Sequence, residues 1–252
     1  MNKVRDLWAQ GRPACGSWMQ IASPLAAETL AHAGHDCVVL DVQHSEMNVS
    51  ALMPMLMAIE LGGAEPFVRL RWNRPDDLMY ALDMGAYGVI VPMVETAEEA
   101  EAIVTAAQYP PHGSRSFGPR RPALRYGAPY AQSARNTLVL LAMIETRKGL
   151  DNLDAILSVQ GLDGVFIGPA DLSQSLTGVP RPDSDDPVVI NAVARILTAA
   201  KAHHKRAGIF CAGAEFAARK LREGFDLVTL TPDLALLDKG ARAALMTARA
   251  AL

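Results

Sequence analysis

Long hydrophobic runs, excess charge of either sign and aromatic residues are all scarce in this chain of 252 residues. The longest strongly apolar run, Leu138 to Ile144, is far shorter than the ~20 residues that a membrane-spanning helix needs. The formal net charge is only −3, whereas a nucleic-acid-binding surface needs clustered positive charge. We therefore expect neither a membrane span nor a nucleic-acid partner.

Cysteine is also scarce, with three residues that all lie within apolar stretches: Cys15, Cys37 and Cys211. An odd number in such positions does not form a disulfide framework. The segment from Met1 to Gln20 mixes charges of both signs and has no apolar core of a signal peptide. We therefore expect a globular protein of a reducing compartment, the cytoplasm.

Apolar residues make up 50% of the chain, which is enough for one large core. Short apolar runs bounded by turn residues predict eight strands, each followed by a helix. Continuous apolar runs of this kind are typical of parallel strands that are covered on both faces. The predicted strands are Cys15–Ile21, Cys37–Asp41, Pro66–Leu70, Gly88–Val94, Leu138–Ile144, Gly164–Gly168, Gly208–Cys211 and Asp226–Leu230.

Eight strand–helix units in 252 residues, about 31 residues each, match the size of a (β/α)8 TIM barrel. An open dinucleotide-binding sheet is disfavoured because no G-x-G-x-x-G follows the first strand. We expect a single domain over residues 1–252 with no internal boundary. Two long connections, Tyr109–Thr137 and Ser173–Asp186, exceed ordinary loop lengths and predict a function or a subunit contact.

Four of the predicted strands finish in ionisable residues or lead directly into them, at the end where a barrel builds its active site. These residues are Asp41, His44, Arg69, Glu145 and Asp171. Taken singly, a strand-end carboxylate caps a helix or pairs with an arginine as readily as it binds a ligand. The fold, however, brings all five residues to one mouth, which favours a functional site.

The chemistry of this set suits reactions next to a carbonyl group. Glu145 and Asp171 offer the oxygen ligands that Mg²⁺ or Mn²⁺ prefers. Arg69 presents a planar donor fork to a carboxylate, keto oxygen or enolate, and His44 is a candidate general base near neutral pH. None of the six lysines lies in a predicted strand, which argues against a Schiff-base aldolase.

Seven segments in order along nearly the whole chain share their pattern with one family: Leu40–His44, Val68–Asn73, Leu82–Gly85, Val91–Val94, Tyr109–Arg115, Ile144–Arg147 and Gly164–Ser173. Together they resemble the class II, metal-dependent pyruvate aldolases. This is the group of hydroxyketoacid aldolases that includes 4-hydroxy-2-oxoheptanedioate and 2-dehydro-3-deoxyglucarate aldolases. The last segment is very specific.

The resemblance implies a TIM barrel of the phosphoenolpyruvate/pyruvate type and a role for each matching residue. Glu145 and Asp171 would be the metal ligands for Mg²⁺, Mn²⁺ or Co²⁺, with water and pyruvate completing the shell. His44 would be the base, and Asp83 the carboxylate that raises its basicity. Arg69 would stabilise the enolate.

Further roles follow from the same resemblance. Asp41 would not bind the metal itself but would interact with a water molecule that the metal binds. The backbone from Gly168 through Pro169 and Ala170 to Asp171 would hold the pyruvate carboxylate. Trp18 and Phe210, at the ends of the first and seventh strands, would contact the variable aldehyde part.

The implied activity is reversible aldol cleavage of 4-hydroxy-2-oxo acids, such as the heptanedioate of aromatic catabolism, to pyruvate and an aldehyde. Alternative enzymes on this scaffold are an oxaloacetate decarboxylase and a malyl- or citramalyl-thioester lyase. A barrel that binds metal and keto acid without turnover is a more remote alternative. Gln43, Met143 and Ser116 depart from the family's usual Glu, Gln and Gly, which puts the natural acceptor in doubt.

The last predicted helix, from about Pro232 to Ala250, carries apolar residues over a wider arc than one-sided packing on a barrel needs. The resemblance implies barrels that exchange their last helix with a neighbour and assemble into hexamers. The arginine-rich stretch Arg115–Arg135 should lie away from its own active site and reach that of another subunit. We therefore expect a homo-oligomer.

Overall fold

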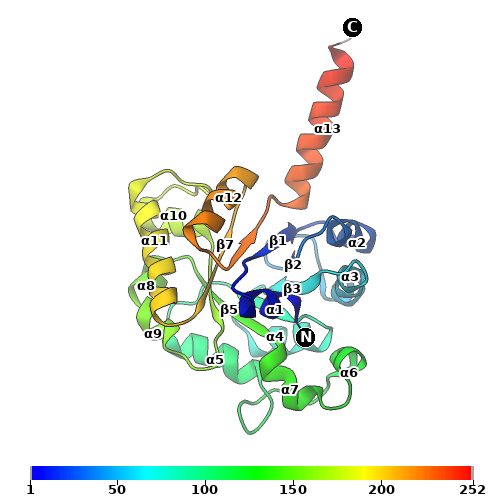
Figure 1. Ribbon diagram of the computed structural model, residues 1–252, viewed down its shortest axis with the longest axis vertical. Coiled ribbons are helices and arrows are strands. Elements are labelled where there is room, and N and C mark those ends of the chain that lie inside the picture. The colour runs from blue at the N-terminus through cyan, green and yellow to red at the C-terminus, as the bar shows by residue number, and fades with distance from the viewer. Residues whose placement is uncertain (1, 251–252) are drawn as a thin grey trace.

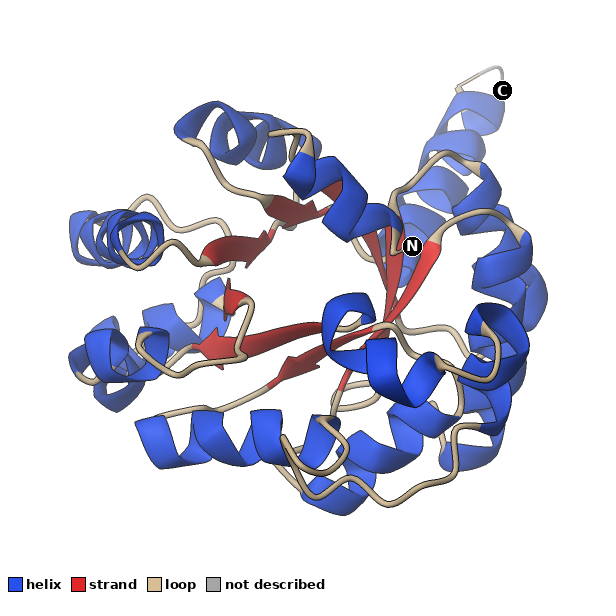
Figure 2. Ribbon diagram, turned by 60° about the horizontal axis from the view of Figure 1, so that its bottom comes forward, coloured by secondary structure: helices blue, strands red, loops and turns tan. Residues whose placement is uncertain are grey.

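The computed structural model describes residues 2–250. Eight parallel strands form a closed barrel in which each strand pairs with its neighbours in sequence and β8 pairs with β1. Helices surround the strands (Figure 2), which confirms the predicted (β/α)8 barrel. The strands are β1 (Ala14–Met19), β2 (Cys37–Asp41), β3 (Glu65–Arg69), β4 (Gly88–Val91), β5 (Val139–Ile144), β6 (Gly164–Ile167), β7 (Arg206–Phe210) and β8 (Leu227–Thr229).

Several helices begin where the sequence provides a side-chain cap. Ser23 caps α2, and Thr96 with Glu99 forms a reciprocal capping box at α5. The helices are α1 (Lys3–Ala9), α2 (Pro24–His32), α3 (Val49–Leu61), α4 (Pro75–Asp83), α5 (Ala97–Ala107), α6 (Arg120–Tyr126), α7 (Tyr130–Thr137), α8 (Arg147–Asp151), α9 (Leu153–Leu157), α10 (Pro169–Thr177), α11 (Pro187–Ala202), α12 (Ala214–Glu223) and α13 (Asp233–Arg249).

Most strand boundaries differ from the sequence prediction by one or two residues, and three larger differences have a local cause. The fourth strand ends at Val91 because Pro92 has no N–H to donate and Met93 adopts a φ of 56°. The helix expected after the fifth strand is divided at Asn152, whose side-chain amide donates to the carbonyl of Glu95. The long connection before β5 is not an open loop, because it contains α6 and α7.

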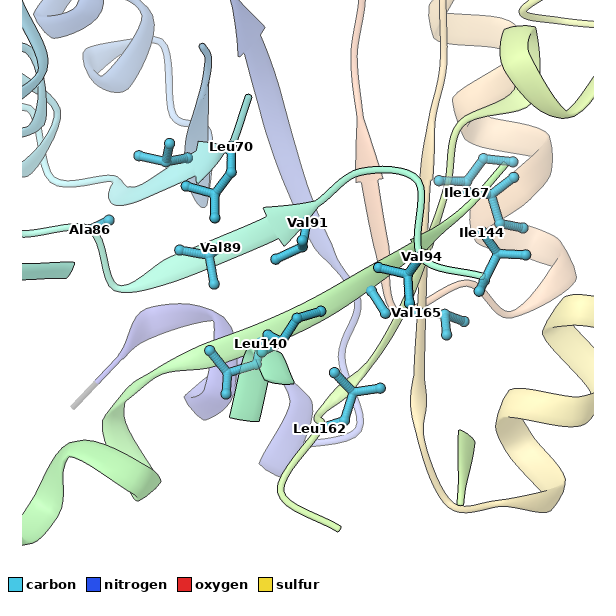
Figure 3. Packing of buried hydrophobic residues seen from close by; sticks show 14 of the residues in the cluster. Leu70, Ala86, Val89, Val91, Val94, Leu140, Ile144, Leu162, Val165 and Ile167 are labelled. Carbon is cyan, nitrogen blue, oxygen red and sulfur yellow. The ribbon is translucent and has the colours of Figure 1, made fainter. Parts of the chain in front are cut away.

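Apolar side chains fill two layers of the barrel. The inner layer contains residues that point to the barrel axis, such as Trp18, Phe67 and Phe166. A Cβ at Gly88 would overlap the ring of Phe67, so glycine is needed at this position. The outer layer lies between strands and helices, and Figure 3 shows part of it, including Val89 and Val165. Burial on both faces explains the continuous apolar runs.

Helix α1 closes one end of the barrel. Its residues Val4, Leu7 and Trp8 belong to the inner apolar layer. The fully buried Asn2 caps this helix and donates from Nδ2 to the carbonyls of Tyr87 and Thr137. These carbonyls precede β4 and β5, so α1 covers the amino-terminal ends of the strands. The opposite end, where the strands finish, is left to form the site.

The last helix, α13, extends away from the barrel (Figure 1). Asp233 is its one buried residue within the described chain. This carboxylate accepts hydrogen bonds from the backbone N–H groups of Gln20 and Ile21, each at 2.9 Å. Leu237 and Met246 are 62% and 72% exposed. The apolar surface of α13 is therefore not covered by its own barrel.

Within residues 2–250, no helix combines the length and apolar character needed to cross a membrane.

Candidate active site

The predicted strand-end residues converge, as expected, on the open end of the barrel. Asp41 and Arg69 are the last residues of β2 and β3, Glu145 directly follows β5, and Asp171 lies in the first turn of α10 after β6. A cavity of about 180 Å³ opens beside them and is lined by three of them, Asp41, Arg69 and Asp171, whereas Glu145 lies behind its lining. Its lining residues are Trp18, Gln20, Asp41, His44, Arg69, Met143, Gly168, Pro169, Ala170, Asp171, Phe210 and Pro232.

A buried ion pair between Asp41 and Arg69 forms one wall of the cavity. The guanidinium donates from Nε to Oδ1 at 2.9 Å and from Nη2 to Oδ2 at 2.7 Å. It also lies 4.9 Å from the ring centroid of Trp18. Burial alone would raise the pKa of Asp41, but the hydrogen bonds and charge of Arg69 outweigh burial and hold that pKa below its ordinary value.

Asp41 also organises the loop that carries His44. Its Oδ1 accepts the backbone N–H groups of Gln43 and His44, both at 3.1 Å. Its Oδ2 accepts the indole N–H of Trp18 at 3.2 Å. Asp41 therefore fixes both Arg69 and the loop of His44. Its predicted action on a metal-bound water stays a prediction.

His44 lies in this loop directly after β2, with an exposed side chain at the edge of the cavity. Its backbone is held from both sides, because the N–H donates to Asp41 and the carbonyl accepts the side-chain amide of Gln20 at 3.2 Å. The imidazole is thus presented to the cavity by a fixed backbone. This position suits a general base.

Glu145 is almost fully buried, with 1% of its surface exposed. Its Oε1 accepts the N–H of Met93 at 2.7 Å, whereas Oε2 is buried and has no hydrogen-bond partner among residues 2–250. Burial raises the pKa of this carboxyl to about 7, and the negative charge of Asp171 adds to the effect. A divalent cation between the two carboxylates would satisfy this orphaned oxygen.

The backbone next to Glu145 leaves room for such a group. A Cβ on Gly168 would overlap Glu145 Oε2 and would lie 2.7 Å from Cε of Met143. No three His, Cys, Asp or Glu side chains of the described chain gather into a metal site. The orphaned Oε2 of Glu145 and the nearby carboxylate of Asp171 fit a cation that takes its other ligands from water and substrate.

Helix α10 begins at the cavity without a side-chain cap. Gly168 occupies the cap position, Pro169 is the first helical residue, and no side chain bonds to the first N–H groups. Among residues 2–250, the N–H groups of Ala170 and Asp171 have no hydrogen-bond partner, and they lie at a helix N-terminus beside the cavity. Such a terminus binds carboxylates well, and the binding of the pyruvate carboxylate at this place stays a prediction.

The structure places Asp83 apart from the other predicted site residues. It is the last residue of α4, and a helix after a strand returns the chain to the opposite end of the barrel. There it accepts a 2.6 Å hydrogen bond from the buried guanidinium of Arg115. Within one chain, Asp83 does not reach His44, so its predicted effect on the basicity of that residue stays a prediction.

Trp18 and Phe210 line the cavity and form an apolar wall with the ring of Phe166 behind them; their predicted contact with the aldehyde stays a prediction. The ring centroid of Trp18 lies 5.2 Å from Phe210 and 5.8 Å from Phe166. Gln20 and Pro232 belong to the lining but were not among the predicted residues. Gln20 was predicted to lie inside the first strand, Cys15–Ile21, whereas in the structure β1 ends at Met19 and Gln20 directly follows it.

Comparison with protein families matches residues 14–239 to the HpcH/HpaI aldolase/citrate lyase family. The chain is 54% identical over 250 residues to a hydroxypyruvate/pyruvate aldolase of Rhizorhabdus wittichii, covering 99% of this chain and 100% of the relative. It is 38% identical over 247 residues to a 4-hydroxy-2-oxo-heptane-1,7-dioate aldolase of Salmonella dublin, covering 96% of this chain and 92% of the relative.

The fold agrees with these matches. A crystal structure of an HpcH/HpaI aldolase/citrate lyase family protein from Burkholderia cenocepacia superimposes with a TM-score of 0.90 and 32% identity, covering 99% of this chain and all of that one. The resemblance predicted from the seven motifs is confirmed. The chain belongs to the HpcH/HpaI aldolase/citrate lyase family.

Proposed function

We propose that this chain catalyses the reversible aldol cleavage of 4-hydroxy-2-oxo acids to pyruvate and an aldehyde. The observation that carries the proposal is the buried Oε2 of Glu145, which has no hydrogen-bond partner among residues 2–250. It lies beside Gly168, which lines the cavity together with Asp171 and Arg69. The names of the two aldolase relatives support the same reaction. One of these names adds hydroxypyruvate to pyruvate as a donor.

Glu145 and Asp171 would hold a divalent cation, and we propose Mg²⁺, Mn²⁺ or Co²⁺. When bound, such an ion acts as a Lewis acid that polarises the keto group of the substrate. The free N–H groups of Ala170 and Asp171 would bind the substrate carboxylate. Arg69 keeps donors beyond those that bind Asp41, because Nη1 has no hydrogen-bond partner among residues 2–250. These N–H groups would reach the keto oxygen.

In the cleavage direction, His44 takes the proton from the C4 hydroxyl of the substrate. The C3–C4 bond then breaks, the aldehyde leaves, and the electron pair forms the enolate of pyruvate. Arg69 stabilises the negative charge that develops on the enolate oxygen. His44 then gives the proton that it took from the C4 hydroxyl to C3, which forms pyruvate and restores the free base, and the reverse sequence forms the aldol.

We further propose that the chain works in the cytoplasm as one domain and as a homo-oligomer, a hexamer by resemblance to its family. Its three cysteines are free thiols. The uncovered apolar surface of α13 supports packing against a second copy. Asp83 would serve His44 only across such an interface, because the two residues of one chain lie at opposite ends of the barrel.

The test is release of pyruvate, followed with lactate dehydrogenase, from a panel of 4-hydroxy-2-oxo acids and from oxaloacetate. We expect cleavage of the hydroxy-oxo acids, complete loss after exhaustive chelation, and recovery with Mg²⁺, Mn²⁺ or Co²⁺. Decarboxylation of oxaloacetate alone would replace the proposal by a decarboxylase. Trapping of pyruvate on the protein by borohydride would replace it by a Schiff-base aldolase.

A further inference from the structure

The side chain of Gln20 lies at the cavity between two groups of the site. Gln20 directly follows β1, and its Nε2 lies 3.3 Å from Oδ2 of Asp41 and 3.2 Å from the carbonyl oxygen of His44. Its own backbone N–H donates to the buried carboxylate of Asp233. Gln20 is therefore held at both its backbone and its side chain.

The two partners fix the orientation of the Gln20 amide. A backbone carbonyl only accepts hydrogen bonds, and so does the carboxylate of Asp41, which the bidentate contact with Arg69 keeps ionised. The NH₂ group must therefore face Asp41 and His44, with both hydrogens used. The oxygen Oε1 is left as an acceptor, and no donor among residues 2–250 bonds to it.

The position of Gln20 in the barrel indicates which part of the substrate this oxygen meets. In a closed barrel of eight strands, β1 lies four strands from β5, so Gln20 faces Glu145 across the mouth. The keto acid end of the substrate belongs with Glu145 and Asp171. The aldehyde end therefore extends towards β1, where Trp18, Phe210 and Pro232 offer mainly apolar surface.

We propose that Gln20 is a specificity-determining residue that accepts a hydrogen bond from a hydroxyl group on the aldehyde part of the substrate. An amide oxygen fixed in this way pairs with a hydroxyl donor and gives nothing to a plain alkyl chain or to a carboxylate, both of which lack a donor. Hydroxylated aldehydes are thus the substrate class of this chain. The inference rests on the proposed aldolase function.

The experiment measures kcat/KM for glycolaldehyde and for acetaldehyde, with pyruvate as donor, in the metal-loaded enzyme. Gln20→Met keeps the length of the side chain and removes the acceptor. We expect the glycolaldehyde-to-acetaldehyde ratio to fall about fivefold in this variant, the effect of one lost hydrogen bond. The intrinsic reactivities of the two aldehydes affect the ratio equally in both proteins, so they cancel when the ratio of the variant is divided by that of the wild type.

The matched control is Gln10→Met at the closed end of the barrel, which should leave the ratio unchanged. A fall of equal size for both aldehydes in Gln20→Met would overturn the inference, because loss of positioning alone affects both. Gln20→Leu serves if Gln20→Met fails to fold in thermal unfolding. A wild-type enzyme that cleaves no 4-hydroxy-2-oxo acid would instead overturn the proposed function, which separates the two failures.

Discussion

Asp41 holds the polar side chains of the site in place. Its carboxylate accepts hydrogen bonds from Arg69, Trp18, Gln20 and the backbone of the His44 loop. Replacing it by alanine leaves the Arg69 guanidinium buried without its ion-pair partner. We expect Asp41→Ala to lower the free energy of unfolding by about 3–5 kcal/mol, measured by chemical denaturation. Asp76→Ala breaks an exposed pair with Arg74 and should change stability little; equal losses would contradict the assigned role of Asp41.

His44 is expected to transfer the proton of the C4 hydroxyl and to do little for pyruvate binding. His44→Ala should therefore lower kcat for cleavage by about 10²–10⁴ and leave the affinity for pyruvate nearly unchanged. The readouts are steady-state cleavage and calorimetric binding of pyruvate to the metal-loaded variant. Near wild-type turnover at saturating substrate would mean that another group is the base.

Glu145 makes the stability of the chelator-treated protein depend on pH. Burial raises the pKa of its carboxyl from 4.5 to about 7, so the folded state holds the proton more tightly than the unfolded state. Its contribution to stability is complete below pH 4.5 and is lost as the pH rises through about 7. The loss should be at most about 3 kcal/mol. The free energy of unfolding, measured by chemical denaturation between pH 4.5 and 7, should fall less with pH in Glu145→Gln than in the wild type. An equal pH dependence in the two proteins would contradict the assignment.

Among the helices and strands, the sequence predicted best those whose ends are marked by a change from apolar to charged residues. The strand Cys37–Asp41 was predicted to the residue, because it is a fully apolar run that ends in a carboxylate. The convergence of Asp41, Arg69, Glu145 and Asp171 followed from the fold alone, since all parallel strands end at one mouth. The local sequence pattern was therefore enough to predict the position of site residues that lie at the ends of strands.

The remaining features depend on tertiary contacts that no local pattern encodes. Asp83 ends a helix, so its distance from His44 follows from the path of the chain and not from its motif. The contact of Gln20 with His44 joins residues 24 positions apart. Helices α6 and α7 were missed because their first residues, Arg120 and Tyr130, follow Pro119 and Pro129, which provide no side-chain cap.

The turn between β6 and α10 should tolerate no side chain at Gly168. An added Cβ would occupy the space beside Glu145 Oε2 and push against Met143. We expect Gly168→Ala to lose most of its affinity for divalent cations, measured by isothermal titration calorimetry. Gly240→Ala in α13, where a Cβ meets nothing within 4 Å, is the control and should bind metal as the wild type does. Equal affinity in both variants would show that this space is not part of the metal site.

At the scale of the whole molecule, the barrel leaves α13 uncovered. Light scattering coupled to size exclusion should therefore give a mass that is a multiple of 27.0 kDa. Replacing Leu237 and Leu245, which are 62% and 50% exposed, by aspartate should shift the protein towards the monomer by placing charges in the proposed interface. A stable and fully active 27.0 kDa monomer would refute the proposed assembly.

The attachment of α13 has a consequence for kinetics. The helix is joined to the barrel through Asp233, whose carboxylate holds the backbone of Gln20 and Ile21, and the preceding Pro232 lines the cavity. Whatever fixes the direction of this helix therefore also fixes one wall of the site. If a second copy does so, dilution lowers the specific activity along with the mass. The dissociation constant of the assembly can then be determined from the specific activity in a dilution series, without a separate measurement of molecular mass.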